Sequence, residues 1–180
     1  GKFKMDLGTP RLRQGEHGAE YVAAWASETV TGRDIVITNV DIDNLLRAKA
    51  AIYAGFTVLA QSVGVDLADV QKLLIGGAFG KYINVEKAVQ IGLLPDMPWD
   101  RFHFLGNTSV MGAYMALLSR EARAQIKAIA EKMTYIELSA DNTFYDAFTS
   151  ALFLPHTDMS RFPTVAAIWD NGSRTINLAP

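Results

Sequence analysis

One short glycine-rich segment is the part of the sequence best suited to holding a ligand. It directly follows the apolar run at 72–75, which predicts a strand, and it consists of Gly76, Gly77, Ala78, Phe79 and Gly80. Residues without a Cβ atom let the backbone approach a ligand closely and adopt positive φ angles. A planar base or a ribose could therefore lie against this turn. The alternative is a tight turn that only lets a helix pack on a strand, because short glycine motifs are weak signals.

Other familiar ligand-binding and catalytic patterns are absent. The sequence has neither a phosphate loop ending in Gly-Lys-Ser/Thr nor Gly-x-Gly-x-x-Gly. His17, His103 and His156 stand far apart, and none forms a spaced group with a carboxylate, so no metal site is predicted. Asp41 and Asp43 are better explained as helix caps than as a catalytic pair. Covalent catalysis has no support in the sequence.

Two successive strand-to-helix units position the glycine segment. The first runs from the strand at 72–75 through the turn to a brief helix, which Asn84 caps and Gly92 and Pro95 close. The second is a strand at 102–105 followed by Gly-Asn-Thr-Ser and a helical stretch with Val110, Ala113 and Leu117 on one face.

The N-terminal part predicts a loop, a hairpin and a long helix. Residues 1–18 are polar and glycine-rich without periodicity, which indicates loop or a cut edge, whereas 20–26 and 34–38 read as paired strands. The stretch 41–63 predicts a helix that Asp41 or Asp43 caps. One apolar stripe is expected to face the core: Leu45, Ile52, Phe56, Leu59 and Val63.

The C-terminal part predicts a charged helix at 119–132, a strand at 134–138 and a helix at 141–152. The tail at 157–180 contains Pro163 and is expected to be loop-like. Strands that alternate with helices favour an α/β fold with a mixed sheet and flanking helices, because the hairpin adds antiparallel pairs to a parallel arrangement.

Composition excludes several classes. Hydrophobic residues make up 49% and charged residues 20% of the 180, which is typical of a folded globular protein. The net charge of -2 argues against a nucleic-acid partner. No apolar stretch reaches the roughly 18 residues of a membrane span, and residues 1–5 lack a signal-peptide core, so a cytoplasmic protein without membrane contact is expected.

Several blocks of the sequence resemble, in order, the ATP-dependent reductive activators of corrinoid proteins. The blocks cover 41–55, Leu-Ile-Gly-Gly-Ala-Phe-Gly at 74–80, Ile-Gly-Leu-Leu-Pro-Asp at 91–96, Leu-Gly-Asn-Thr-Ser at 105–109 and Ala-Leu-Phe-Leu-Pro-His at 151–156. The glycine turn also resembles the adenosine motif of the wider acetate kinase, sugar kinase, Hsp70 and actin superfamily, and Gly112-Ala113 resembles that motif's following Gly-Ala. The resemblance implies a ribonuclease H-like, actin-like half domain.

The resemblance also implies ligand contacts. Besides the turn, it marks the helix that edges the adenine and ribose, with Asn44, Arg47 and Lys49 as candidate contacts. Arg47 shares a helix face with Ala50, whereas Lys49 lies on a different face. A solvated helix face or a surface salt bridge is the alternative for both cations.

The same resemblance implies parts that this sequence lacks. It places a [2Fe-2S] cluster on four cysteines of an N-terminal part, and this chain contains no cysteine to ligate a cluster. It also implies ATP with Mg and an upstream phosphate-binding loop, for which Asp6-Leu-Gly-Thr9 is a poor match because Pro10 follows without a preceding strand. Residues 1–180 are thus expected to be the C-terminal portion of an actin-like nucleotide-binding domain.

Three functions follow as hypotheses. The first is the ATP-binding part of an activase that drives reduction of Co(II) corrinoid to Co(I) on a partner corrinoid protein or methyltransferase, expected to be a homodimer. The second is a non-catalytic docking or dimerisation module, for which the small residues at 48–55 would allow close packing. The third is an actin-like ATPase acting on another metalloprotein.

Overall fold

The computed structural model describes residues 2–140 and 142–172. Its N-terminal part is an antiparallel sheet in the order β1-β2-β3. The elements here are η1 (Met5–Leu7), β1 (Leu12–Gly15), β2 (Gly18–Ala24), η2 (Ala26–Glu28) and β3 (Ile35–Thr38). The predicted hairpin is confirmed as β2 and β3. The prediction that residues 1–18 are loop or a cut edge is wrong for Leu12–Gly15, because β1 pairs with β2 in register from Leu12 opposite Tyr21.

An ion-pair cluster explains why so polar a strand forms. Arg13 on β1 donates from Nε to Glu20 Oε1 at 2.7 Å and from Nη1 to Asp34 Oδ2 at 2.8 Å. The backbone N–H of Ala26, and then Arg13, hold the pKa of Asp34 below its ordinary value. These partners lie up to 21 residues away in sequence, so periodicity alone could not reveal the strand.

The long helix α1 (Asn39–Ser62) begins earlier than predicted, with Thr38 as its N-cap instead of Asp41 or Asp43. Thr38 Oγ1 accepts a hydrogen bond from Asp41 N at 3.2 Å, and Asp41 Oδ2 accepts one from Thr38 N at 2.8 Å. This reciprocal arrangement is a capping box. The Thr38 N–H, and then its hydroxyl, lower the pKa of Asp41.

This cap gives a first testable prediction. Thr38→Ala removes the acceptor for Asp41 N and should lower the free energy of unfolding by about 1 kcal/mol. Asp43→Ala is the matched control, since Asp43 lies beyond the cap and should change stability by less than about 0.5 kcal/mol. Urea unfolding followed by circular dichroism measures both. Equal losses in the two variants would contradict the assignment of the cap to Thr38.

The buried face of α1 is not the predicted stripe. Of the predicted stripe, Phe56 is partly buried against the core, but Leu45, Ile52, Leu59 and Val63 are exposed. The buried side chains of α1 are Leu46, Lys49, Ala50, Tyr53, Ala54, Thr57 and Val58. The helix α5 (Asn142–Ala151) packs along α1. Small residues allow this close approach, and Ala50, Ala54 and Ala151 are each fully buried.

The two predicted strand-to-helix units are confirmed. They comprise β4 (Leu73–Gly76), η4 (Gly80–Tyr82), α2 (Val85–Gln90), β5 (Phe102–Gly106) and α3 (Thr108–Leu118), with η3 (Leu67–Asp69) and η5 (Trp99–Arg101) before the strands. Asn84 Oδ1 caps α2 by accepting from Lys87 N at 3.0 Å. Strands β4 and β5 are parallel and form a sheet of their own. The predicted α/β class, with antiparallel and parallel pairs, is therefore confirmed, divided between two sheets.

Two C-terminal predictions are wrong. No strand forms at 134–138, where irregular chain leads into η6 (Leu138–Ala140) after the helix α4 (Arg120–Ala130). In the tail predicted as loop-like, residues 157–172 contain η7 (Met159–Arg161) and α6 (Pro163–Gly172), and residues 173–180 lie outside the described residues. Pro163 occupies the first helical position, where its missing N–H costs nothing. The carboxylate of Asp96 accepts hydrogen bonds from Thr164 N at 2.8 Å and from Thr164 Oγ1 at 2.6 Å. It thereby satisfies a backbone N–H in the first turn of α6, although Asp96 lies 68 residues earlier in the sequence.

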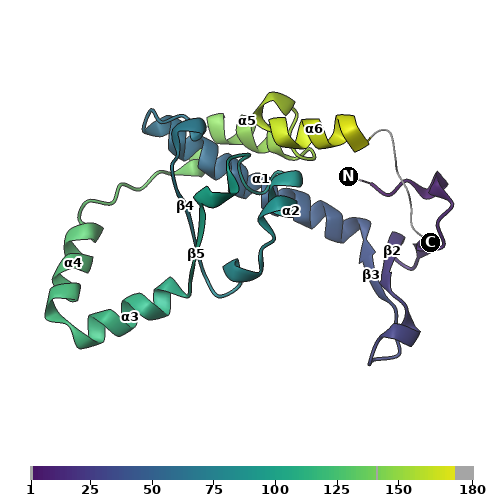
Figure 1. Ribbon diagram of the computed structural model, residues 1–180, viewed down its shortest axis with the longest axis horizontal. Helices are drawn as coiled ribbons and strands as arrows, with labels where there is room; N and C mark the ends of the chain where they lie inside the picture. The colour runs from purple at the N-terminus through teal and green to yellow at the C-terminus, as the bar shows by residue number, and fades with distance from the viewer. Residues whose placement is uncertain (1, 141, 173–180) are drawn as a thin grey trace.

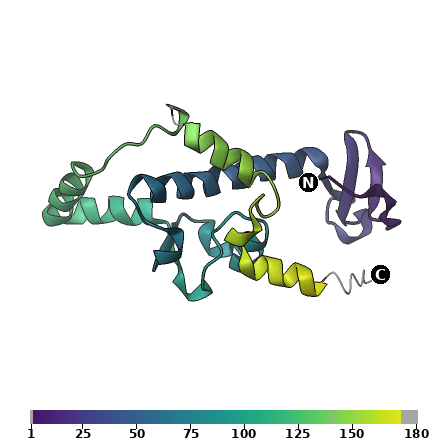
Figure 2. The same cartoon turned by 90° about the horizontal axis from the view of Figure 1, so that it is seen from above.

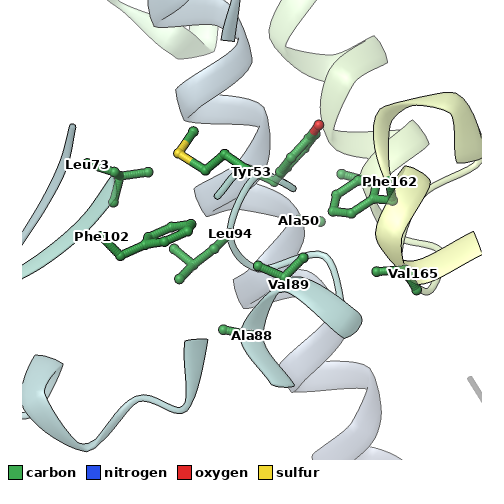
Figure 3. Packing of buried hydrophobic residues seen from close by; sticks show 11 residues of the cluster. Ala50, Tyr53, Leu73, Ala88, Val89, Leu94, Phe102, Phe162 and Val165 are labelled. Carbon is green, nitrogen blue, oxygen red and sulfur yellow. The ribbon is translucent and has the colours of Figure 1, made fainter. Parts of the chain in front are cut away.

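The core gathers around the middle of α1 (Figure 3). Its buried members are Ala50, Tyr53, Leu73, Ala88, Val89, Leu94, Met97, Phe102, Ala151, Phe162 and Val165. The rings of Tyr53 and Phe162 lie 5.3 Å apart, which joins α1 to the segment before α6. In Figures 1 and 2, the three-stranded sheet lies at the N-terminal end of α1. The helices α3 and α4 lie toward the other end of α1 and extend away from it. Across the described ranges, no helix is both long enough and apolar enough to cross a membrane.

Candidate functional site

The candidate site lies where two parallel strands end side by side. Both β4 and β5 finish with glycine, and Gly76 is in register with Gly106. Just beyond, Gly77 N donates a hydrogen bond to Gly106 O at 2.6 Å. The carboxyl ends of parallel strands are the usual ligand-binding edge of α/β sheets. The glycine turn predicted from sequence therefore sits at the expected edge.

The glycines of this turn meet two different structural requirements, close packing and a positive φ angle. A Cβ on Gly76 would lie 2.8 Å from Thr108 Oγ1, and one on Gly80 would lie 3.0 Å from Ile75 Cγ2, so both permit close packing. Gly77 has φ +110, and no atom lies within 4 Å of its Cβ position. Its backbone conformation requires glycine, and the space beside it is open. The packing explanation thus fits Gly76 and Gly80, while Gly77 presents bare backbone outward.

The first turn of α3 forms the neighbouring part of the site. Asn107 caps the helix, since its Oδ1 accepts from Val110 N at 3.1 Å. Thr108 touches Gly76, and Gly112 lies one turn further on the same helix face, with no atom within 4 Å of its Cβ position. Sequence reasoning missed Thr108 and Gly106 as site residues, although the second Gly-containing strand end at 105–109 was the available signal.

The other predicted contacts are separated by the fold. Asn44 and Arg47 are exposed on the first half of α1, next to β3, whereas Ala78 and Phe79 are exposed in the turn that follows β4 (Figure 1). The structure therefore leaves all four side chains accessible but places them on two distinct elements.

The structure does not place Lys49 where the predicted contact with a ligand could form. Its side chain is fully buried, and Nζ donates to Pro155 O at 2.8 Å and to Phe153 O. Burial lowers the pKa of Lys49 to about 8, because the charged form loses hydration. An ammonium enclosed between α1 and the loop after α5 is not available to a nucleotide. Its role is to hold that loop against α1.

His156 is likewise part of the core packing. Its ring lies 5.4 Å from the ring of Tyr53, and its Nδ1 accepts from Asp158 N at 2.9 Å. Burial, followed by the charge of Arg161, lowers its pKa. Within residues 2–140 and 142–172, no group of three or more His, Cys, Asp or Glu side chains is arranged to hold a metal ion.

A hollow of about 730 Å³ lies elsewhere, between the second half of α1 and the segments at 64–68, 95–96 and 158–163. Its charged groups already have local partners. Asp158 accepts a hydrogen bond from Ser160 N at 3.1 Å and forms an ion pair with Arg161 Nε at 3.5 Å. Asp96 accepts the hydrogen bond from Thr164 N at the start of α6. The hollow therefore fits structural packing better than a ligand site, and the glycine turn remains the candidate.

Helices that flank two short sheets make this an α/β domain. Comparison with known families assigns the domain to the actin-like ASKHA class. The chain belongs to the family described as the C-terminal domain of RACo, the ASKHA domain, whose model matches residues 1–166. The resemblance to corrinoid-protein activators is thereby confirmed, as is the actin-like fold expectation.

Named relatives agree with this family. The chain is 39% identical over 123 residues to the corrinoid activation enzyme RamQ of Eubacterium limosum, covering 68% of this chain and 21% of the relative. It is 27% identical over 125 residues to the [Co(II) methylated amine-specific corrinoid protein] reductase of Methanosarcina barkeri, covering 68% and 23%. A solved reductive activator for corrinoid, iron-sulfur protein is 50% identical with a TM-score of 0.85, covering 91% of this chain and 26% of that one. The chain thus spans about a quarter of these relatives.

Proposed function

We propose that this chain is the C-terminal, ATP-binding part of a reductive activator, which uses ATP to drive reduction of a Co(II) corrinoid to Co(I) on a partner methyltransferase protein. The family match and the names of three relatives support the reaction. The observation that carries the binding role is the open backbone of Gly77 at the ends of two parallel strands.

The proposed nucleotide wall is the glycine turn with the start of α3. Gly76, Gly77 and Ala78 would lie against the adenosine, with Gly77 making the closest approach because the space beside its backbone is open. Phe79 is exposed beside them and offers an apolar face for the base. Asn44 and Arg47 remain proposed contacts only if other parts of the longer protein bring the ligand to α1.

The redox group of the proposed reaction belongs outside these residues. The chain has no cysteine, so thiolate ligands of a [2Fe-2S] cluster must come from elsewhere in the longer polypeptide. Mg and the phosphate-binding loops are proposed for that remainder too. Binding and hydrolysis of ATP would supply the free energy for an unfavourable electron transfer, because a ligand shifts a two-state equilibrium by its differential affinity. The homodimer and the cytoplasmic location stay predictions.

Calorimetric titration with Mg·ATP and Mg·ADP tests the nucleotide site. Gly77→Val puts a branched side chain into the open space and should weaken binding at least roughly tenfold. Gly32→Val is the matched control, because Gly32 also has positive φ, at +64, and open space around its Cβ position but lies in the loop before β3. It should leave affinity unchanged.

Wild-type affinity in the Gly77→Val variant would contradict adenosine binding at the turn. If the longer protein itself binds no ATP, the docking or dimerisation module becomes the better function for this chain. Reduction of a metalloprotein without a corrinoid would instead support the third hypothesis, an actin-like ATPase serving another partner.

A further inference from the structure

The register of β4 against β5 decides where the glycine turn lies. Gly76 is paired with Gly106 at the carboxyl ends of the two strands. Moving β4 by one residue along β5 would displace the turn by about 3.3 Å. Gly77 N would then no longer lie opposite Gly106 O, to which it donates a hydrogen bond at 2.6 Å. The position of the proposed nucleotide wall therefore depends on this one register.

The side chains of β4 specify this register weakly. A slip of one residue normally moves apolar side chains to the wrong face of a sheet. In β4, however, Leu73 is buried and Leu74 is 60% exposed, so a slip exchanges one leucine for another. At the other end, the tight contact of Gly76 with Thr108 excludes only the slip that brings Ile75 there, because the opposite slip brings another glycine. The register therefore needs a further determinant.

Arg101 connects the segments that lead into the two strands. It is the last residue of η5 and directly precedes Phe102, the first residue of β5. Its Nη1 donates hydrogen bonds to Ala68 O at 3.1 Å and to Val70 O at 2.9 Å, in the segment before β4. These two carbonyls lie 33 and 31 residues earlier in the sequence. One guanidinium thus joins the entries of both strands.

Both ends of this connection are anchored locally. Arg101 N donates to Pro98 O at 3.1 Å, so the backbone that carries the guanidinium is held in η5. On the other side, Asp66 Oδ1 accepts from Ala68 N at 2.9 Å and caps η3, while Val70 packs against the core. Only two residues lie between Val70 and the start of β4, so this link cannot absorb a slip. A slip of β4 would therefore carry both carbonyls out of hydrogen-bonding reach.

We propose that Arg101 is a positioning residue for the glycine turn, because it fixes the register of β4 against β5 and thereby places Gly77 at the carboxyl edge of the strands. Two strands alone are marginally stable, so one such connection has a measurable effect. Arg101 lies at the amino end of the strand pair and would not touch the nucleotide. Its importance for nucleotide binding rests on the function proposed above, whereas its control of the register does not.

Hydrogen exchange at the Gly77 amide, measured by residue-resolved mass spectrometry on the longer protein, tests the register. Arg101→Ala should speed this exchange at least roughly tenfold, while the amide of Ala54 in α1 keeps its rate. Arg101→Lys should restore most of the protection, because one nitrogen makes both hydrogen bonds and an ammonium carries three donors. Arg33→Ala is the matched control at an exposed arginine before β3, and it should change neither rate.

An unchanged Gly77 rate in Arg101→Ala would overturn the proposal, and so would equal acceleration at Gly77 and Ala54, which indicates general destabilisation. Calorimetric titration of the same variants with Mg·ATP tests the consequence for the ligand. Arg101→Ala should weaken binding at least roughly fivefold, and Arg101→Lys should bind within about twofold of the wild type. Faster exchange with wild-type affinity would refute the positioning role. If the wild-type protein binds no ATP, the proposed function fails, and the exchange rates alone decide whether Arg101 fixes the register.

Discussion

Replacing Gly92 with alanine is expected to lower the free energy of unfolding by about 3 kcal/mol or more. Gly92 closes α2 with φ +76, and a Cβ there would lie 2.1 Å from Pro155 O, 2.8 Å from Pro155 C and 3.0 Å from Pro155 Cα. These are backbone atoms, and Pro155 O also accepts the hydrogen bond from Lys49. The clash therefore cannot be relieved by rotating a side chain, and the loop after α5 would have to leave α1.

Gly64→Ala separates this clash from backbone strain. Gly64 has φ +68, close to that of Gly92, but no atom lies within 4 Å of its Cβ position. Its substitution should cost only about 1 to 2 kcal/mol, the penalty for a left-handed residue with a side chain. Urea unfolding of both variants measures the difference. Identical losses would show that Pro155 is not held against Gly92.

The stability of the protein is expected to rise between pH 8 and pH 10, by up to about 2 kcal/mol. The pKa of Lys49 is about 8 in the folded protein and 10.5 for an ordinary lysine. Between these values the unfolded chain holds a proton that the folded protein has released, so stability increases with pH. Below pH 8 both states are protonated and this contribution is constant.

Lys49→Met should abolish the rise, because methionine does not titrate. Lys72→Met is the control, since Lys72 is exposed and its removal should keep the rise. Measurements should stop near pH 10, because burial raises the pKa of Tyr53, and its delayed deprotonation lowers stability at higher pH. A rise that persists in Lys49→Met would assign it to another group.

Local signals accounted for much of the fold. Asn84 capping α2, and the glycine turn after β4, depend on neighbours within a few residues, and both were predictable. The elements that prediction missed depend on distant partners. Strand β1 needs Arg13 to meet Asp34, and α6 needs Asp96. The members of these pairs lie 21 and 68 residues apart, beyond the span of the local patterns that predict a single strand or helix.

The candidate site also combines features that local sequence predicts with features that depend on distant residues. The turn could be located from its glycines, but the distinction between packing and openness required Thr108, which only the parallel register brings to Gly76. For Lys49, local sequence led to a wrong expectation of its exposure. A lysine in a helix predicts exposure, and its burial follows from carbonyl acceptors more than 100 residues further along the chain.

The hydrogen bonds from Thr164 to Asp96 make the last described helix dependent on chain that lies between the two parallel strands. Asp96 belongs to the segment that follows α2, so α6 keeps these two hydrogen bonds at its start only while that segment is in place. Proteolytic nicking near residue 96 would weaken the start of α6, although the cut is far away in sequence and Val165 still packs in the core. The state of α6 therefore reports on the integrity of the strand pair that carries the glycine turn.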